Sequence, residues 1–135
     1  METLFHIHSG VRWLIVIVAV MTFVRLAIGY FGRQPYDRSA RGLVALFSTF
    51  IDIQILLGLI YFIWSGIDND YWPRARFEHM VVMFVAAFIA HLPVRWRKSP
   101  DPLRYRNDML VVLVVLVVVF VGVVLLPGGT ARWEF

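Results

Sequence analysis

Four long apolar blocks, separated by short charged connections, constrain this chain more than any other feature. They run from about residues 4 to 31, 43 to 64, 77 to 94 and 109 to 126. A helix needs about 20 mostly apolar residues to cross a bilayer, with a range of roughly 17–25. In the whole chain 60% of residues are hydrophobic, 16% are charged and the mean hydropathy is +0.74, whereas soluble domains have roughly 45–50% apolar and about 25% charged residues. We therefore expect an all-α integral membrane four-helix bundle, forming a single membrane domain over residues 1–135.

The composition of the last block supports helices rather than strands in this setting. It consists of Val, Leu and Phe with a single Gly, and no polar side chain lies between Met109 and Pro127. In a soluble protein such β-branched runs would indicate a strand, but in lipid the backbone must satisfy its own hydrogen bonds, which favours a helix.

Basic residues are concentrated on one side of the expected bundle. Eight lie in or beside the connections that follow the first and third blocks: Arg33, Arg38, Arg41, Arg95, Arg97, Lys98, Arg104 and Arg106. The other side has three: Arg74, Arg76 and Arg132. The positive-inside rule then predicts that both termini lie on the outer, periplasmic side and that both basic connections face the cytoplasm.

Two further expectations follow from the same charges. The N-terminus has no basic segment and no small-residue cleavage site, so we do not expect the first block to be a removable signal peptide. The basic connections also resemble a nucleic-acid patch, but their expected role is to set topology beside anionic lipid. The predicted partner is therefore the lipid bilayer and not nucleic acid.

Histidines are the strongest candidates for chemistry in this chain. With no cysteine present, neither disulfides nor thiolate metal sites can form. His6 and His8 lie within about two turns of the outer end of the first helix, and His79 lies near the outer end of the third. Two helices therefore carry histidines at nearly the same depth. Ionisable residues inside membrane spans are functional-site hypotheses by default.

Paired imidazoles on facing helices suit a b-type haem, since four-helix bundles hold cofactors between inward-facing side chains. Each neutral imidazole offers one ring nitrogen to iron, while the other takes a partner that fixes the tautomer. His6 and His8 are about 200° apart around the helix, so only one of them faces a given cofactor. We favour His8, because Arg12 lies four residues on, upon the same face, where it suits a haem propionate. The predicted haem b therefore has His8 and His79 as iron ligands, with His6 as the alternative to His8, and Arg12 and Arg76 as further binding residues.

Simpler roles compete with this prediction. Histidines at headgroup depth also occur as amphipathic interface residues without any ligand. Met83, four residues after His79, fits either an axial ligand or a gap-filling core side chain. Glu78 adjoins His79 but points elsewhere, where it could orient His6 or form a salt bridge.

Asp52 and His91 form a second candidate site, deeper in the bundle. Each lies about 18 Å from the outer end of its own helix, Asp52 in the second helix and His91 in the third. A carboxylate in hydrocarbon is costly unless it is paired or protonated. The pair therefore suggests a proton-accepting or quinone-binding site, with quinone as a second candidate cofactor, or a structural hydrogen bond between two helices.

Three segments carry a resemblance to a known family. They are HSGVRWLIVIV at residues 8–18, DIQILLGLIYF at residues 52–62 and FEHMVVMFVAAFIAH at residues 77–91. With these segments the chain resembles the small four-helix bacterial membrane proteins of the cytochrome b-like type, over nearly its whole length. The resemblance implies a haem-binding or electron-transfer protein of the bacterial inner membrane. The tail PGGTARWEF departs from the family's shorter ending and suggests a partner contact.

Three functions remain for comparison with the structure. The first is an electron carrier or complex subunit rather than a stand-alone enzyme, with one bis-histidine haem near the outer face, acting with other membrane redox subunits. The second is a cofactor-free structural or anchor subunit of a larger respiratory or photosynthetic membrane complex. The third is a small transporter or membrane enzyme that uses Asp52 and His91 for protons, although no broken helix or repeat pair marks a midplane substrate site.

Overall fold

The computed structural model describes residues 1–134, and these residues form four long helices and two short 3-10 segments. In chain order the elements are α1 (Glu2–Phe31), α2 (Arg38–Asn69), α3 (Arg74–Ala90), η1 (Leu92–Trp96), α4 (Asp101–Val124) and η2 (Gly129–Trp133). No strand occurs in this part of the chain. The helices α1, α2 and α4, and the segment Arg74–Trp96, are each long and apolar enough to cross a membrane. The prediction of an all-α four-helix bundle is confirmed.

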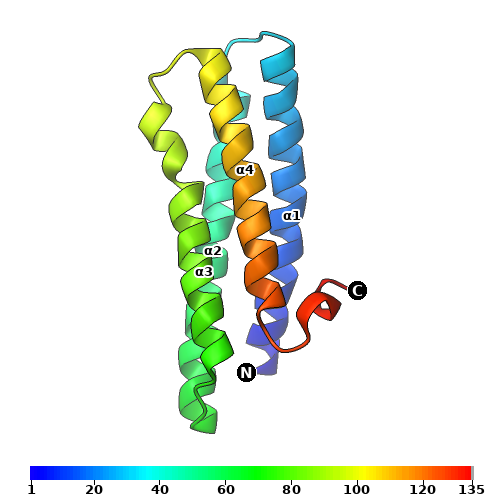
Figure 1. Ribbon diagram of the computed structural model, residues 1–135, viewed down its shortest axis with the longest axis vertical. Coiled ribbons are helices and arrows are strands. Elements are labelled where there is room, and N and C mark those ends of the chain that lie inside the picture. The colour runs from blue at the N-terminus through cyan, green and yellow to red at the C-terminus, as the bar shows by residue number, and fades with distance from the viewer. Residues whose placement is uncertain (135) are drawn as a thin grey trace.

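The two ends of the bundle differ in what they carry (Figure 1). The N-terminus, the connection from α2 to α3 and the segment η2 lie toward one end, which we call the terminal end. The connections 32–37 and 97–100 lie at the other end, which we call the basic end. Both α1 and α3 pack against α2 and α4, so that α1 and α3 lie diagonally across the bundle from each other.

The helices α2 and α4 extend beyond their apolar blocks, because capping residues lie outside those blocks. The side chain of Asp37 caps α2 by accepting a hydrogen bond from the backbone N–H of Ala40 at 3.0 Å. That bond is the main reason why the pKa of Asp37 is lowered to about 2. The other end of α2 is closed by Asp70 in the left-handed conformation. Pro100 and Pro102 begin α4, where a missing N–H is harmless.

The third membrane segment is not one continuous helix. We expected it to run to residue 94, but α3 ends at Ala90, His91 is its C-cap and the chain continues as η1. Pro93 explains the break, because proline has no N–H to give to Ile89 and its ring clashes with the carbonyl one turn back. Figure 1 shows the interruption between α3 and the short segment that follows it.

The buried core is built mainly from α1 and α4. Ile15, Ala19 and Leu26 of α1 are almost completely buried, as are Val112 and Val115 of α4. The helices α2 and α3 bury few side chains and present large apolar residues on their outer faces. An apolar exterior of this kind is what a helix needs where it meets lipid.

A buried carboxylate ties the basic end together. Asp108 of α4 is 2% exposed, and Tyr36 donates its hydroxyl hydrogen to one carboxylate oxygen at 2.5 Å. Trp96 of η1 donates its indole N–H to the other oxygen at 2.7 Å. Burial raises the pKa of Tyr36, and its hydrogen bond to Asp108 raises it further. The three residues join the first connection, η1 and α4.

Candidate cofactor site

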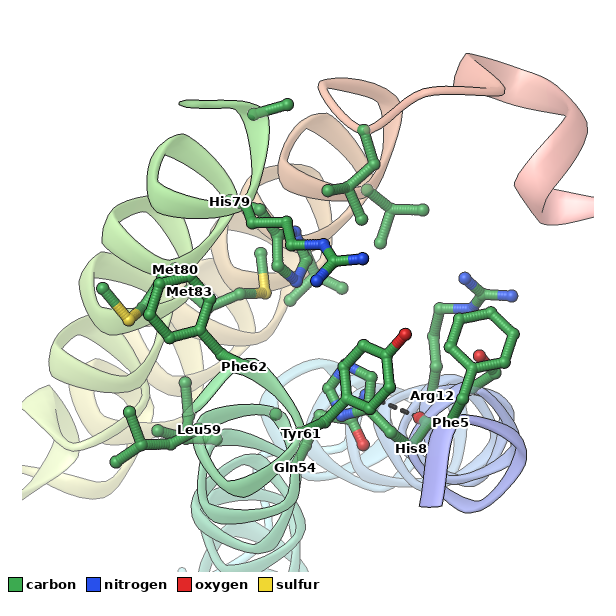
Figure 2. Close-up of a pocket in the computed structure, with 18 of the residues that line it drawn as sticks. Phe5, His8, Arg12, Gln54, Leu59, Tyr61, Phe62, His79, Met80 and Met83 are labelled. Atoms are coloured by element: carbon green, nitrogen blue, oxygen red, sulfur yellow. Dashed lines mark hydrogen bonds between the residues drawn. The ribbon is translucent and has the colours of Figure 1, made fainter. Parts of the chain in front are cut away.

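A cavity of about 250 Å³ lies between the helices toward the terminal end of the bundle. All four long helices line it, together with Pro127 and Arg132 from the segment after α4. Figure 2 shows His8 of α1 beside Tyr61 and Gln54 of α2, with His79 of α3 on the far side. The lining is mostly apolar and aromatic, as expected of a cofactor site with a few placed polar groups. Its apolar members include Phe5, Leu59, Phe62, Met80 and Met83.

His79 is held in one tautomer by α4. Its Nδ1 lies 2.7 Å from the backbone carbonyl oxygen of Gly122. A carbonyl oxygen only accepts hydrogen bonds, so Nδ1 carries the proton and Nε2 carries a lone pair. Metal-binding histidines almost always donate their second ring N–H to a carbonyl or carboxylate in this way. His79 therefore makes the kind of second contact that orients a metal-binding imidazole.

The ring of His8 makes no hydrogen bond within the described residues. Its Nδ1 is fully buried without a partner, which is rare for a polar atom in a folded protein. The backbone carbonyl of His8 accepts a hydrogen bond from Gln54 Nε2 at 2.9 Å, which fixes α1 against α2. The ring itself packs on Gly58, where an added Cβ would lie 2.8 Å from His8 Cε1. Packing therefore orients His8, and its ring nitrogens have no structural partner.

The structure distinguishes the two histidines of α1. His8 lines the cavity, whereas the side chain of His6 is exposed and lies 3.8 Å from Glu2. Glu78 does not orient His6, because it pairs with Arg74 at 2.7 Å. His8 and His79 line the same cavity. These are the two histidines that helix lengths predict to lie at one depth.

Met83 lines the same cavity but also packs against α4. A Cβ at Gly122 would collide with Met83 Cε, so the glycine makes room for the methionine side chain. This packing matches the gap-filling role considered for Met83.

The cavity carries positive charge without a carboxylate. Arg12, Arg76 and Arg132 line it, and no Asp or Glu among the described residues does. None of the three forms an ion pair within the described part of the chain. Arg12 donates to the Arg132 backbone carbonyl at 2.7 Å and leaves its Nε buried without a partner. Arg76 donates to Ser65 Oγ at 2.6 Å. These guanidinium groups retain donors for an anionic ligand.

Arg132 lines the cavity although no sequence pattern indicates it, because a turn after α4 carries it there. Gly128 and Gly129, with φ angles of +101° and +50°, turn the chain back after α4. The segment η2 then lies beside α1 (Figure 1). The ring of Trp133 packs edge-to-face on Trp13. The Arg12 guanidinium carbon lies 4.7 Å from the centroid of the Trp133 ring. The tail therefore packs on its own bundle next to the cavity, and Arg12 links the two.

Asp52 and His91 are in contact but lie outside the cavity. His91 Nε2 is 2.9 Å from Asp52 Oδ1, and the two side chains are 54% and 53% exposed. Asp52 points away from the cavity, because Gln54 lines the cavity and a residue two positions earlier lies about 200° around the helix. The contact satisfies two polar groups on an apolar surface. Their use for protons or quinone stays a prediction.

Among the described residues no group of three or more His, Cys, Asp and Glu side chains could hold a metal ion. His8 and His79, which line one cavity, are a pair and so fall outside that search. Comparisons with protein-family models, with curated proteins and with solved structures find no match.

Proposed function

We propose that this chain is a membrane-spanning b-type haem protein that transfers electrons, in which His8 and His79 would hold the haem iron. The observation that carries the proposal is the shared cavity. Imidazoles from two helices line it, and the carbonyl of Gly122 leaves Nε2 of His79 with a lone pair. A histidine with only a structural role is expected to use its ring nitrogens in hydrogen bonds, and His8 does not.

The other lining residues fit the rest of such a cofactor. Haem carries two propionate carboxylates, and arginine binds carboxylates through paired N–H donors. Arg12, Arg76 and Arg132 provide three guanidinium groups with no competing acid in the cavity. Apolar side chains such as Leu59 and Met80 provide a dry wall for a porphyrin face.

Bound haem supplies one-electron chemistry, with a reduction potential set by its axial ligands and surroundings. The chain's own residues then have distinct tasks. The Gly122 carbonyl orients the His79 ring and raises its basicity as a ligand. Packing on Gly58 holds the His8 ring, and the apolar helices exclude water from the space between the two imidazoles.

We place the protein in the bacterial inner membrane, with the terminal end outside. Eight Lys and Arg residues belong to the basic end and three to the terminal end, which favours the basic end in the cytoplasm. The cavity then lies near the outer face, where it suits electron exchange between quinol and a periplasmic or membrane partner.

The test is haem content of the purified protein, with matched histidine variants. We expect the wild type, expressed with added haem, to show b-type reduced-minus-oxidised bands and a positive pyridine haemochrome assay. His8→Ala and His79→Ala should each lose most of this haem. His6→Ala and His91→Ala remove histidines that do not line the cavity and should retain it.

Haem-free wild-type protein would refute the proposal. It would favour the cofactor-free anchor subunit, for which the apolar outer faces of α2 and α3 offer surface to a partner. Equal loss of haem in all four variants would also refute it, because ligation would then not depend on the cavity.

A further inference from the structure

A second hollow lies at the basic end, far along the bundle from the histidine cavity. It is a groove of about 510 Å³ between α2, η1 and the first turns of α4. The groove lies where the third segment breaks, and His91 and Pro93 at the break both line it. None of the residues that line the histidine cavity lines this groove.

Four basic side chains line the groove: Arg41, Arg97, Lys98 and Arg104. None of them forms an ion pair within the described residues. Arg104 is held in place by Tyr36, whose ring centroid is 3.7 Å from the guanidinium carbon.

The acidic groups near the groove are already engaged. Asp108 is the only acidic residue that lines it in the described part of the chain, and its two oxygens accept hydrogen bonds from Tyr36 and Trp96. His91 also lines the groove, and its Nε2 is held by Asp52. The groove therefore has four cationic side chains against one carboxylate, so its lining has an excess of positive charge.

The remaining wall of the groove is mostly apolar, and its one hydroxyl, that of Ser48, donates to the backbone carbonyl of Ala45 at 3.0 Å. It is formed by Val44 and Ala45 of α2, Ala90 of α3, and Pro93 and Val94 of η1. Ala45 and Val94 are exposed, so the apolar wall continues onto the outer surface of the bundle. A cluster of cations beside an apolar strip matches a ligand with an anionic head and a hydrocarbon chain.

We propose that this groove binds an anionic phospholipid, with its phosphate among Arg41, Arg97, Lys98 and Arg104 and an acyl chain along the apolar wall. Basic pockets between membrane helices on the cytoplasmic side recognise anionic lipid headgroups in this way. Guanidinium groups match phosphate oxygens through paired hydrogen bonds. The inference rests on the membrane placement proposed above but not on haem.

The experiment measures lipid retention by native mass spectrometry of the detergent-solubilised chain, with phosphatidylglycerol and phosphatidylcholine as probes. We expect a clear preference for phosphatidylglycerol. The triple variant Arg41→Gln, Arg97→Gln, Lys98→Gln should weaken phosphatidylglycerol binding roughly a hundredfold at low salt, since each nearby cation contributes about fivefold. Haem content should not change, which separates this test from that of the proposed function.

The matched control removes three charges from the same end of the bundle. Arg38, Arg95 and Arg106 do not line the groove, so Arg38→Gln, Arg95→Gln, Arg106→Gln should retain most of the affinity. A neutral variant, Ala45→Phe, fills the groove from the exposed face of α2 and should also weaken phosphatidylglycerol binding.

Three results would overturn the proposal. The first is equal loss of affinity in both triple variants, because binding would then follow overall charge rather than the groove. The second is wild-type affinity in Ala45→Phe. The third is displacement of the lipid by inorganic phosphate at matched ionic strength, since the site would then bind phosphate without needing an acyl chain.

Discussion

Gly58 is where α2 leaves room for the proposed iron ligand, so one methyl group there tests the site. In Gly58→Ala the new Cβ would lie 2.8 Å from His8 Cε1 and 3.4 Å from Nδ1. Carbon atoms pack at about 3.5–4.0 Å, so the rigid ring must move by about 1 Å. Metal–ligand distances are defined to within about 0.2 Å. We therefore expect Gly58→Ala to lose most of its haem.

Gly42 provides a control in the same helix, because a Cβ there meets nothing within 4 Å. Alanine in place of glycine inside a helix stabilises by roughly 0.5–1 kcal/mol. Gly42→Ala should show that gain and retain its haem. Gly58→Ala receives the same backbone gain but also an overpacking cost of about 1–3 kcal/mol, so its free energy of unfolding should fall below that of Gly42→Ala.

Two assays measure these effects: haem per chain by pyridine haemochrome, and denaturant unfolding of the haem-free chain in detergent micelles. The reasoning is refuted if Gly58→Ala retains full haem and gains as much stability as Gly42→Ala. That result would mean that the His8 ring does not rest on Gly58.

Three further predictions concern the basic end. Asp108→Ala leaves the buried hydroxyl of Tyr36 and the partly buried indole N–H of Trp96 without an acceptor. At about 1–3 kcal/mol for each donor, the free energy of unfolding should fall by at least about 2 kcal/mol, and an unchanged unfolding midpoint would contradict this. Asp37, with a pKa lowered from 3.8 to about 2 by the Ala40 N–H, stabilises the fold above its ordinary pKa and loses this effect as the pH falls toward 2. Asp37→Asn keeps a capping oxygen but cannot titrate, so its melting temperature should depend less on pH between 3.8 and about 2 than that of the wild type. An equal change of melting temperature with pH in the variant and the wild type would argue against the cap. Because the pKa of Tyr36 is raised, stability should decline above about pH 10, and Tyr36→Phe should remove this decline in melting experiments at high pH.

The arrangement of the helices could be predicted because lipid permits few alternatives. An apolar block long enough to cross a bilayer must satisfy its backbone internally, so hydropathy located the middle of each helix. It did not locate the ends of α2 and α4, because Asp37, Asp70 and Pro100 lie outside the apolar blocks. The break after Ala90 was also missed, although Pro93 was its signal.

The candidate site could be predicted only as far as helix depth and helix face determine it. Arginine asymmetry and helical rise brought His8 and His79 to one level, and the four-residue spacing placed Arg12 beside His8. The partner of His79 is a backbone carbonyl, which every residue has, so no side-chain pattern identifies Gly122. Arg132 reaches the cavity through the turn at Gly128 and Gly129, and this long-range packing has no periodic signal.

The most direct test of the central proposal is the spin state of the iron in the oxidised protein, measured by electron paramagnetic resonance. With His8 and His79 both bound, we expect a low-spin ferric signal in the wild type. His8→Gly or His79→Gly should convert any retained haem to the high-spin form, and added imidazole should restore the low-spin signal by filling the vacated position. A low-spin signal that survives both substitutions unchanged would contradict ligation by these two histidines.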